Sequence, residues 1–237
     1  MQVRVGSVLG GVVQAVVLTA VLGGCAQSAD GDKPDGDKKA SASASATAEG
    51  AGAKGTAAAS GGTVGAAGSA CELPVSFAVA QHWKPKGIDA GKELAKASNG
   101  PDGDLTGALA DSFLRQGPVT AACEIDAKPA GHIGFLRVWT GEPGDADART
   151  VLRAFVAAED NVSKEKYRAV TTGGGLSGVE VEYLYTSKLL DETKKERALA
   201  VTTPDGPVVL HLGGMDTEEH EAMLPAYELA KRTLRVA

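Results

Sequence analysis

Four histidines are the residues of this 237-residue chain that could bind a metal or exchange protons near neutral pH. No two of them have the His-x-x-x-His spacing that places two ligands on one face of a helix: they are His82, His132, His211 and His220. His211 alternates within a predicted strand, which indicates a surface residue or a hydrogen-bonded core residue. His220 falls near the start of a predicted helix, where we expect solvent exposure. We therefore predict no metal site and no catalytic histidine.

A glycine run at 173–175, followed by Ser177, raises two further possibilities, a nucleophilic serine and a phosphate-binding loop. A serine hydrolase would place its serine in a Gly-x-Ser-x-Gly turn between a strand and a helix. A phosphate loop would lead into the first turn of a helix. Here the serine spacing differs and the run leads into a predicted strand, so we interpret the glycines as a flexible turn.

Glu180 and Glu182 are a pair of carboxylates whose spacing could serve acid–base chemistry on a sugar. Residues two apart on a strand point to the same face, about 7 Å from one another. Such pairs usually mark a solvent-exposed face, and only 4% of the residues are aromatic, which leaves few rings for a sugar to stack on. The charged segment 191–197 is interpreted as a solvated loop. The sequence predicts no catalytic residue and no cofactor.

Three cysteines carry the remaining chemistry, and Cys25 follows an apolar stretch of about 15 residues. That length fits the core of a signal peptide and is short for a membrane span of ~20 residues. The tetrapeptide Leu22-Gly23-Gly24-Cys25 resembles the bacterial lipobox, whose cysteine receives a diacylglycerol. The resemblance implies a lipoprotein signal peptide at 1–24 and acyl chains such as palmitate that hold Cys25 at the outer face of the cytoplasmic membrane. The alternatives are an ordinary secretory leader and a retained transmembrane helix.

Cys71 and Cys123 remain once Cys25 is assigned to the lipid. Exported chains lie where disulfides persist, so we predict a bond between these two cysteines. It would close a loop of about 50 residues and stabilise the fold by up to ~4 kcal/mol in the chain-entropy model. The alternatives are two buried thiols and a cysteine that acts together with a histidine.

Residues 25–70 comprise the lipidated cysteine and a stretch rich in Ala, Gly and Ser, in which Val64 is the only large apolar side chain. This composition cannot bury enough surface to offset the entropy of ordering, so we predict a disordered linker with an r.m.s. span of roughly 35–40 Å. Its Asp-Gly-Asp pairs, at 30–37, lack the ligand spacing of an EF-hand. After residue 70 there are 19 basic and 25 acidic residues, a net charge of −6, which argues against nucleic acid as a partner.

Residues 71–237 are long enough for one globular domain, and their hydrophobic periodicity predicts an α+β fold. Alternating apolar residues predict strands, the last four of them antiparallel, at 75–81, 119–125, 133–139, 167–172, 179–185, 198–203 and 208–212. Helical spacing predicts a helix through Leu105, Leu109 and Phe113. Two further helices are expected to begin after the capping residues Asp147 and Asp216.

This order of strands, helix, antiparallel strands and C-terminal helix resembles the PsbP-like fold, in which helices sandwich one sheet. With the lipobox and the tether, the chain resembles actinobacterial lipoproteins of the LpqN kind. The resemblance covers about residues 71–237 and depends on element order and on the segments 133–140 and 217–235. It implies an antiparallel sheet flanked by helices, and a binding or accessory role, because relatives with this fold dock to protein partners. The cysteine pair and the insert at 98–116 have no match in the family pattern.

One short segment could form a partner surface. Trp83 lies between His82 and two lysines, Lys84 and Lys86, just after a predicted strand. The tryptophan is either a core side chain, the interpretation that we prefer, or the anchor of a binding surface with the lysines at its rim.

The sequence therefore favours a membrane-anchored, extracytoplasmic and monomeric lipoprotein whose domain is a non-enzymatic binding or accessory module for a protein or cell-wall partner. One alternative is a carrier of a lipid or another apolar small molecule, which requires a cavity of at least ~300 Å³ between the sheet and a helix. Another is a hydrolase with a nonstandard site built from residues distant in sequence.

Overall fold

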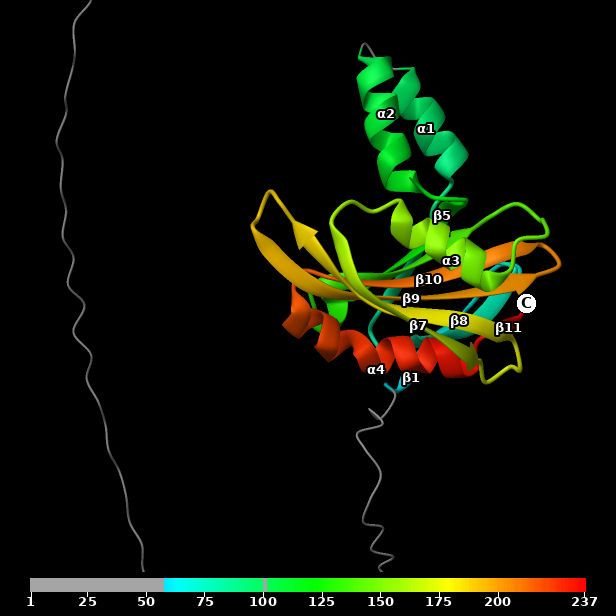
Figure 1. Cartoon of the computed structure of the whole chain (residues 1–237). Coiled ribbons are helices and arrows are strands. Elements are labelled where there is room, and N and C mark those ends of the chain that lie inside the picture. Colours follow the sequence, from blue (N-terminus) through cyan, green and yellow to red (C-terminus); the bar gives the residue numbers. More distant parts are fainter. Residues whose placement is uncertain (1–57, 100–101) are drawn as a thin grey trace, which may run out of the picture. The chain divides into compact units, whose positions relative to one another are not determined.

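A computed structural model of the chain describes residues 58–99 and 102–237 (Figure 1). The predicted signal peptide, the lipidation site Cys25 and most of the predicted linker lie outside these residues. Among the described residues there is no helix with the length and hydropathy that a membrane span requires.

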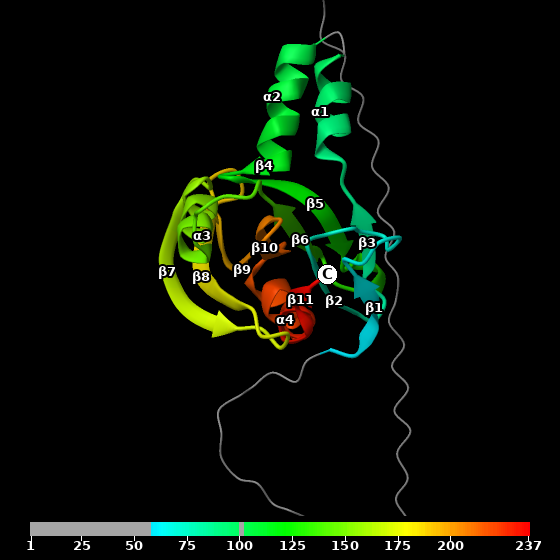
Figure 2. The same cartoon turned by 90° about the vertical axis from the view of Figure 1, so that its right-hand side faces the viewer.

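An antiparallel sheet of eight strands forms the centre of the fold and curls around the C-terminal helix (Figure 2). Its order is β3-β5-β6-β10-β9-β8-β7, and β4 pairs with β5. The strands are β3 Lys84–Gly87, β4 Arg115–Gln116, β5 Val119–Asp126, β6 Gly134–Thr140, β7 Val162–Thr171, β8 Ser177–Ser187, β9 Glu192–Thr203 and β10 Gly206–Gly214. The predicted α+β class and the antiparallel order of the last four predicted strands are confirmed.

A second, three-stranded sheet has the order β1-β2-β11, with both pairings antiparallel. Its strands are β1 Ser60–Val64, β2 Val75–Ala80 and β11 Arg235–Val236. Val64 is only 1% exposed and belongs to the hydrophobic core. The predicted domain boundary at residue 70 is therefore wrong, because pairing with β2 orders a glycine-rich strand whose single large apolar side chain is buried.

Helices α3 (Ala148–Ala157) and α4 (Thr217–Thr233) cover opposite faces of the large sheet (Figures 1 and 2). Asp147 accepts a hydrogen bond of 2.7 Å from the backbone N–H of Thr150, and Asp216 accepts one of 2.8 Å from that of Glu219. Both predicted caps are thus confirmed. The apolar stripes of both helices are buried as expected, and they fill two clusters, one on each side of the sheet.

The glycine run between β7 and β8 allows a close approach of the chain rather than only a turn. A Cβ atom on Gly173 would lie 1.6 Å from the carbonyl oxygen of Arg232, at the end of α4. Any side chain there would push α4 away from the sheet, so glycine at this position fixes how closely the helix packs.

Cys71 and Cys123 form a disulfide, as predicted. Cys71 lies between β1 and β2, and Cys123 lies on β5, so the bond joins the small sheet to the large one. The chain closed by this bond, 52 residues in sequence separation, includes the part of the molecule described next.

Helices α1 (Ala90–Ser98) and α2 (Gly103–Leu114) form a hairpin that projects from the sheet (Figures 1 and 2). The spacing of apolar residues predicted α2, whereas α1 was not predicted from the sequence. Asp89 caps α1 by accepting a hydrogen bond from the backbone N–H of Lys92. A short 3-10 helix, η1 (Lys128–Ala130), connects β5 and β6.

Candidate functional site

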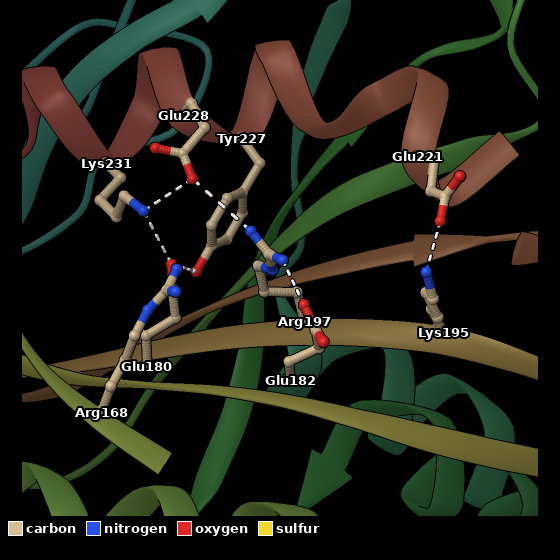
Figure 3. Close-up of polar contacts among 9 residues, drawn as sticks. All are labelled: Arg168, Glu180, Glu182, Lys195, Arg197, Glu221, Tyr227, Glu228 and Lys231. Carbon is tan, nitrogen blue, oxygen red and sulfur yellow. Dashed lines mark hydrogen bonds and ion pairs between the residues drawn. The ribbon is translucent and has the colours of Figure 1, made fainter. Parts of the chain in front are cut away.

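A layer of charged side chains lies between α4 and strands β7 to β9 (Figure 3). Glu180, at its centre, is 1% exposed. Its Oε1 accepts hydrogen bonds of 2.9 Å from the hydroxyl of Tyr227 and of 2.9 Å from Nζ of Lys231. Its Oε2 forms an ion pair with Arg168, and Lys231 also pairs with Glu228 at 2.7 Å. We call these residues, together with Glu182, Lys195, Arg197 and Glu221, the charged layer.

The contacts at the centre of the charged layer shift the pKa values of Glu180 and Tyr227 in opposite directions. Burial alone would raise the pKa of Glu180, but the hydrogen bonds from Lys231 and Tyr227 and the charges of Lys231 and Arg168 outweigh it and lower that pKa. Burial and the neighbouring carboxylate raise the pKa of Tyr227 well above its ordinary value. Glu180 is therefore an ion near neutral pH and Tyr227 a phenol, so neither group is poised to transfer a proton.

Four further side chains continue the charged layer along the sheet. Arg197 pairs with Glu182 on β8 and lies 3.6 Å from Glu228 on α4, and Lys195 pairs with Glu221 (Figure 3). The prediction that Glu180 marks a solvent-exposed face is wrong, because α4 covers that face. The predicted loop at 191–197 is also wrong, since β9 begins at residue 192 and carries paired charges.

A smaller polar cluster lies on the opposite face of the sheet, beneath α3. Nε2 of His211 lies 2.8 Å from Oε2 of Glu196 and 3.2 Å from the hydroxyl of Tyr183, and Nζ of Lys194 lies 2.8 Å from Glu196. Burial would lower the pKa of His211, but the carboxylate of Glu196 raises it overall. The rings of Phe155 and His211 pack in a T-shaped arrangement, with 5.5 Å between their centroids. His211 is thus the hydrogen-bonded core residue that the sequence predicted as one possibility.

His220 is buried, with 1% exposure, so its predicted exposure to solvent is wrong. The first turn of α4 packs directly on β10, where a Cβ atom on Gly214 would lie 2.8 Å from the backbone nitrogen of His220. Burial lowers the pKa of His220 to about 4, and its Nδ1 has no hydrogen-bond partner among the described residues. In residues 58–99 and 102–237, no group of three or more His, Cys, Asp or Glu side chains could hold a metal.

The alternative in which Trp83 anchors a partner surface does not agree with the structure. Trp83 is 7% exposed and belongs to the core, which was the preferred interpretation. Lys84 and Lys86 lie on β3 and are exposed. Trp83 lies between β2 and β3 with its side chain in the core, where it cannot serve as an exposed anchor, so this part of the prediction is corrected.

The hairpin exposes large apolar side chains. Leu105, Leu109 and Phe113 are 65%, 52% and 69% exposed, and none of the residues of α2 is buried. Residues four apart lie on one side of a helix, so the three side chains form a continuous ridge. The sequence identified the spacing of these residues, but spacing alone does not tell an outward-facing stripe from a buried one.

A groove of about 500 Å³ runs beside this ridge, between the two helices. Its lining comes from α1 and α2: Glu93, Lys96, Ala97, Thr106, Ala110, Phe113 and Leu114. Phe113 belongs to both features, so the ridge and the groove share one side of the hairpin. We call the ridge together with the groove the hairpin face.

Close contact between the helices gives the hairpin face its form. The Thr106 hydroxyl donates a hydrogen bond of 2.6 Å to the carbonyl of Ala97, and a Cβ on Gly103 would lie 2.1 Å from the carbonyl of Ser98. Small residues on α2 therefore let α1 approach, while the large residues are directed elsewhere. Isolated apolar residues on a surface are ordinary, whereas contiguous apolar features are typical of interaction sites.

Comparison with curated protein sequences finds no match. Among solved structures, LpqN of Mycobacterium tuberculosis, described as involved in cell envelope biogenesis, matches with 16% identity and a TM-score of 0.38 over 48% of this chain and 71% of that one. Cyanobacterial PsbP from Synechocystis sp. PCC 6803 matches with 12% identity and a TM-score of 0.42 over 69% of this chain and 87% of that one. Both are of the kinds that the sequence resembles.

A protein-family model matches most of the sequence. It is described as "Uncharacterised lipoprotein" and matches residues 40–234. The matched range includes α1 to α4 and every described strand except β11. The chain belongs to this family of lipoproteins.

Proposed function

We propose that this protein is anchored by lipid on Cys25 at the outer face of the cytoplasmic membrane, where its domain acts as a non-enzymatic docking module through the hairpin face. The partner class is a protein or another macromolecule of the cell envelope. The observation that carries the proposal is the exposure of Leu105, Leu109 and Phe113 on a hairpin that projects from the sheet.

The energetics of the hairpin support a docking role. An apolar side chain that stays in water gains none of the roughly 1.5–3 kcal/mol that burial of such a side chain contributes. The three side chains of the ridge, 52–69% exposed, leave a large part of that free energy unused in the fold, although two cores bury their apolar residues almost completely. Contact with a partner would recover it.

The membership in a lipoprotein family and the lipobox-like Leu22-Gly23-Gly24-Cys25 support the anchor. Two or more acyl chains hold a protein stably at a bilayer. A docking module in this place would present its hairpin face to components of the envelope.

The state of the titratable groups supports a role without catalysis. Glu180 and Glu196 are buried and bound to cations, and His211 is bound to Glu196 beneath α3. A general acid or base needs access to substrate and a pKa near the working pH. Apolar side chains with exposures near zero also lie between the large sheet and its two covering helices, which favours docking over a carrier with a cavity there.

Photo-crosslinking in intact cells tests the docking role. A benzophenone amino acid at position 109 should capture a macromolecular neighbour, and the same group at Leu190, in the turn between β8 and β9, should capture much less. Leu190 is a matched control because it is also a leucine, 67% exposed. Equal capture from both positions would contradict the proposal.

The anchor has a separate test. Cys25→Ser should abolish acyl labelling and move the protein from the membrane fraction to the soluble one. Acyl labelling that persists in the variant would contradict lipidation at this residue.

A further inference from the structure

We propose that the partner of the hairpin face is the same face of a second copy, packed with its α2 antiparallel to the first α2 about a two-fold axis near Leu109. The inference deepens the proposed function and rests on it, since it assigns the occupant of the same surface. It replaces the expectation that the protein is monomeric.

Shape is the first reason. A two-fold interface needs a surface that is complementary to itself, with a projection and a recess that match. The hairpin face has both, since the ridge of α2 lies beside the groove of about 500 Å³ between α1 and α2. Helices pack by inserting the ridges of one into the grooves of another, so each copy can supply what the other lacks.

The spacing of the ridge fits an antiparallel register. Leu105 and Phe113 lie four residues on either side of Leu109, so the ridge is symmetric about its middle residue. In an antiparallel pair centred there, Leu105 of each copy lies opposite Phe113 of the other, and the two copies of Leu109 meet at the axis. A leucine then faces the larger phenylalanine at both ends, which keeps the helices evenly separated. The helix dipoles also oppose one another in this arrangement.

Charge at the rim is the third reason. The α1 wall of the groove carries Glu93 and Lys96, of opposite sign, and neither has an ion-pair partner in the part of the chain that the structure describes. A two-fold rotation reverses the order of the two charges, so that each glutamate can approach the lysine of the other copy. A wall with one charge of each sign therefore complements the same wall of a second copy better than it complements a surface whose charges all have one sign.

An anionic lipid surface fits the hairpin poorly. The segment 89–115 contains five acidic and three basic residues, a net charge of −2. Asp102 is the N-cap residue of α2 and Asp104 lies in its first turn, and this end of α2 is the one that projects from the sheet (Figure 1). These carboxylates would reach a bilayer first and be repelled by anionic headgroups.

A second hairpin would also complete a helical core. Helices of nine and twelve residues, such as α1 and α2, are marginal by themselves in water. Two hairpins packed face to face form a four-helix arrangement, in which the ridge residues become the core. The contact is small, so we expect dimers to depend on the high effective concentration that two membrane anchors provide.

The experiment uses the full chain in its own membrane, with a benzophenone amino acid at Leu109. The expected product has twice the mass of the chain, and the same group at Ala95, exposed on α1 outside the groove lining, should give at least tenfold less of it. A product with a different protein would overturn the second copy but leave the docking function in place. A lipid adduct, or no product, would overturn both.

Register and charge are tested in the same membranes. Copies with Leu105→Cys mixed with copies with Phe113→Cys should form disulfide-linked dimers, whereas Leu105→Cys alone should form at least tenfold fewer; the reverse would overturn the antiparallel pair. Glu93→Lys should reduce cross-linking through Leu109, and adding Lys96→Glu should restore it, because the swapped wall again complements itself. Failure of the swap to restore cross-linking would overturn the pairing of the two rims.

Discussion

The charged layer and the hairpin face place their most characteristic residues in opposite environments. In the charged layer, Glu180 is a charged side chain with 1% exposure, surrounded by partners. On the hairpin face, Phe113 is a large apolar side chain with 69% exposure. A buried charge is tolerable only when it is paired, and an exposed apolar surface is tolerable only when it is small or covered.

The residues of the charged layer hold α4 on the sheet, whereas those of the hairpin face are free to contact a partner. Every member of the charged layer drawn in Figure 3 is bound to another member, and several of these pairs connect α4 to the sheet. The hairpin face contributes little to the packing of the domain, and the proposed docking role would account for its apolar character. Substitutions in the two regions should therefore affect different properties, stability in the first and association in the second.

Removal of the carboxylate at the centre of the charged layer should have the largest effect on stability. Glu180→Ala leaves Lys231, whose side chain is 14% exposed, without its buried partner. Loss of one member of a buried pair costs about 3–5 kcal/mol, because the other charge stays desolvated. The free energy of unfolding, measured with urea, should fall by this amount.

Glu221→Ala is the matched control. Glu221 pairs with Lys195 at the exposed end of the charged layer, where both side chains are in contact with solvent (Figure 3). The urea midpoint of this variant should equal that of the wild-type protein. A loss of stability as large as that of Glu180→Ala would show that exposure does not separate the two pairs.

The disulfide should have the next largest effect. Replacement of Cys71 and Cys123 together by alanine should lower the free energy of unfolding by about 2–4 kcal/mol, because the unfolded chain regains the entropy lost by loop closure. The hairpin lies inside this loop, yet its own contacts are unchanged. Cross-linking through Leu109 should therefore persist at low denaturant, and its loss would connect the two regions that we separate here.

Acid should weaken the region under α4 through His220. Its pKa is about 4 in the fold and 6.5 as the ordinary value, so between these pH values the unfolded chain binds a proton that the folded one does not. The contribution of this buried neutral imidazole is complete above pH 6.5 and is lost as the pH falls toward 4, by up to about 3 kcal/mol. The raised pKa of His211 acts in the opposite direction, since its contribution is complete below pH 6.5 and is lost as the pH rises through the folded value.

The change with pH can be assigned by a variant. Urea unfolding of the wild-type protein and of His220→Leu should be compared between pH 7 and pH 4.5. As the pH falls, the wild-type protein should lose stability relative to the variant, which has no imidazole at this position. A difference that is independent of pH would contradict the assignment to His220. Since the segment 89–115 contains no histidine, protonation of this kind does not reach the hairpin directly.

The elements whose sequence pattern reflects only local physics were predicted well. Caps at Asp147 and Asp216 are set by a side chain and a backbone N–H three residues away, so the sequence shows them directly. The disulfide followed from a count of cysteines and the expected compartment. The meander of β7 to β10 followed from alternation and short turns.

The residues that were misjudged depend on contacts between distant segments. Glu180 and His220 look like surface residues in sequence, and only the packing of α4 onto β8 and β10 buries them. β1 is ordered by β2, although its own composition predicts a linker. The exposure of Leu109 has the same origin, because the spacing of a stripe shows which residues share a side of a helix but not whether the domain covers that side.

The smallest effect on stability is expected from the ridge. Combined substitution of Leu105, Leu109 and Phe113 by serine should change the free energy of unfolding by no more than about 0.5 kcal/mol per residue, because exposed side chains lose few contacts. By contrast, Leu210→Ala removes a side chain with 0% exposure and should cost about 2–5 kcal/mol. Cross-linking to the partner should show the opposite order, lost in the ridge variant and retained by Leu210→Ala wherever the chain is still folded. If the ridge variant lost stability as a core variant does, the ridge would belong to the fold, and the distinction between the two regions would fail.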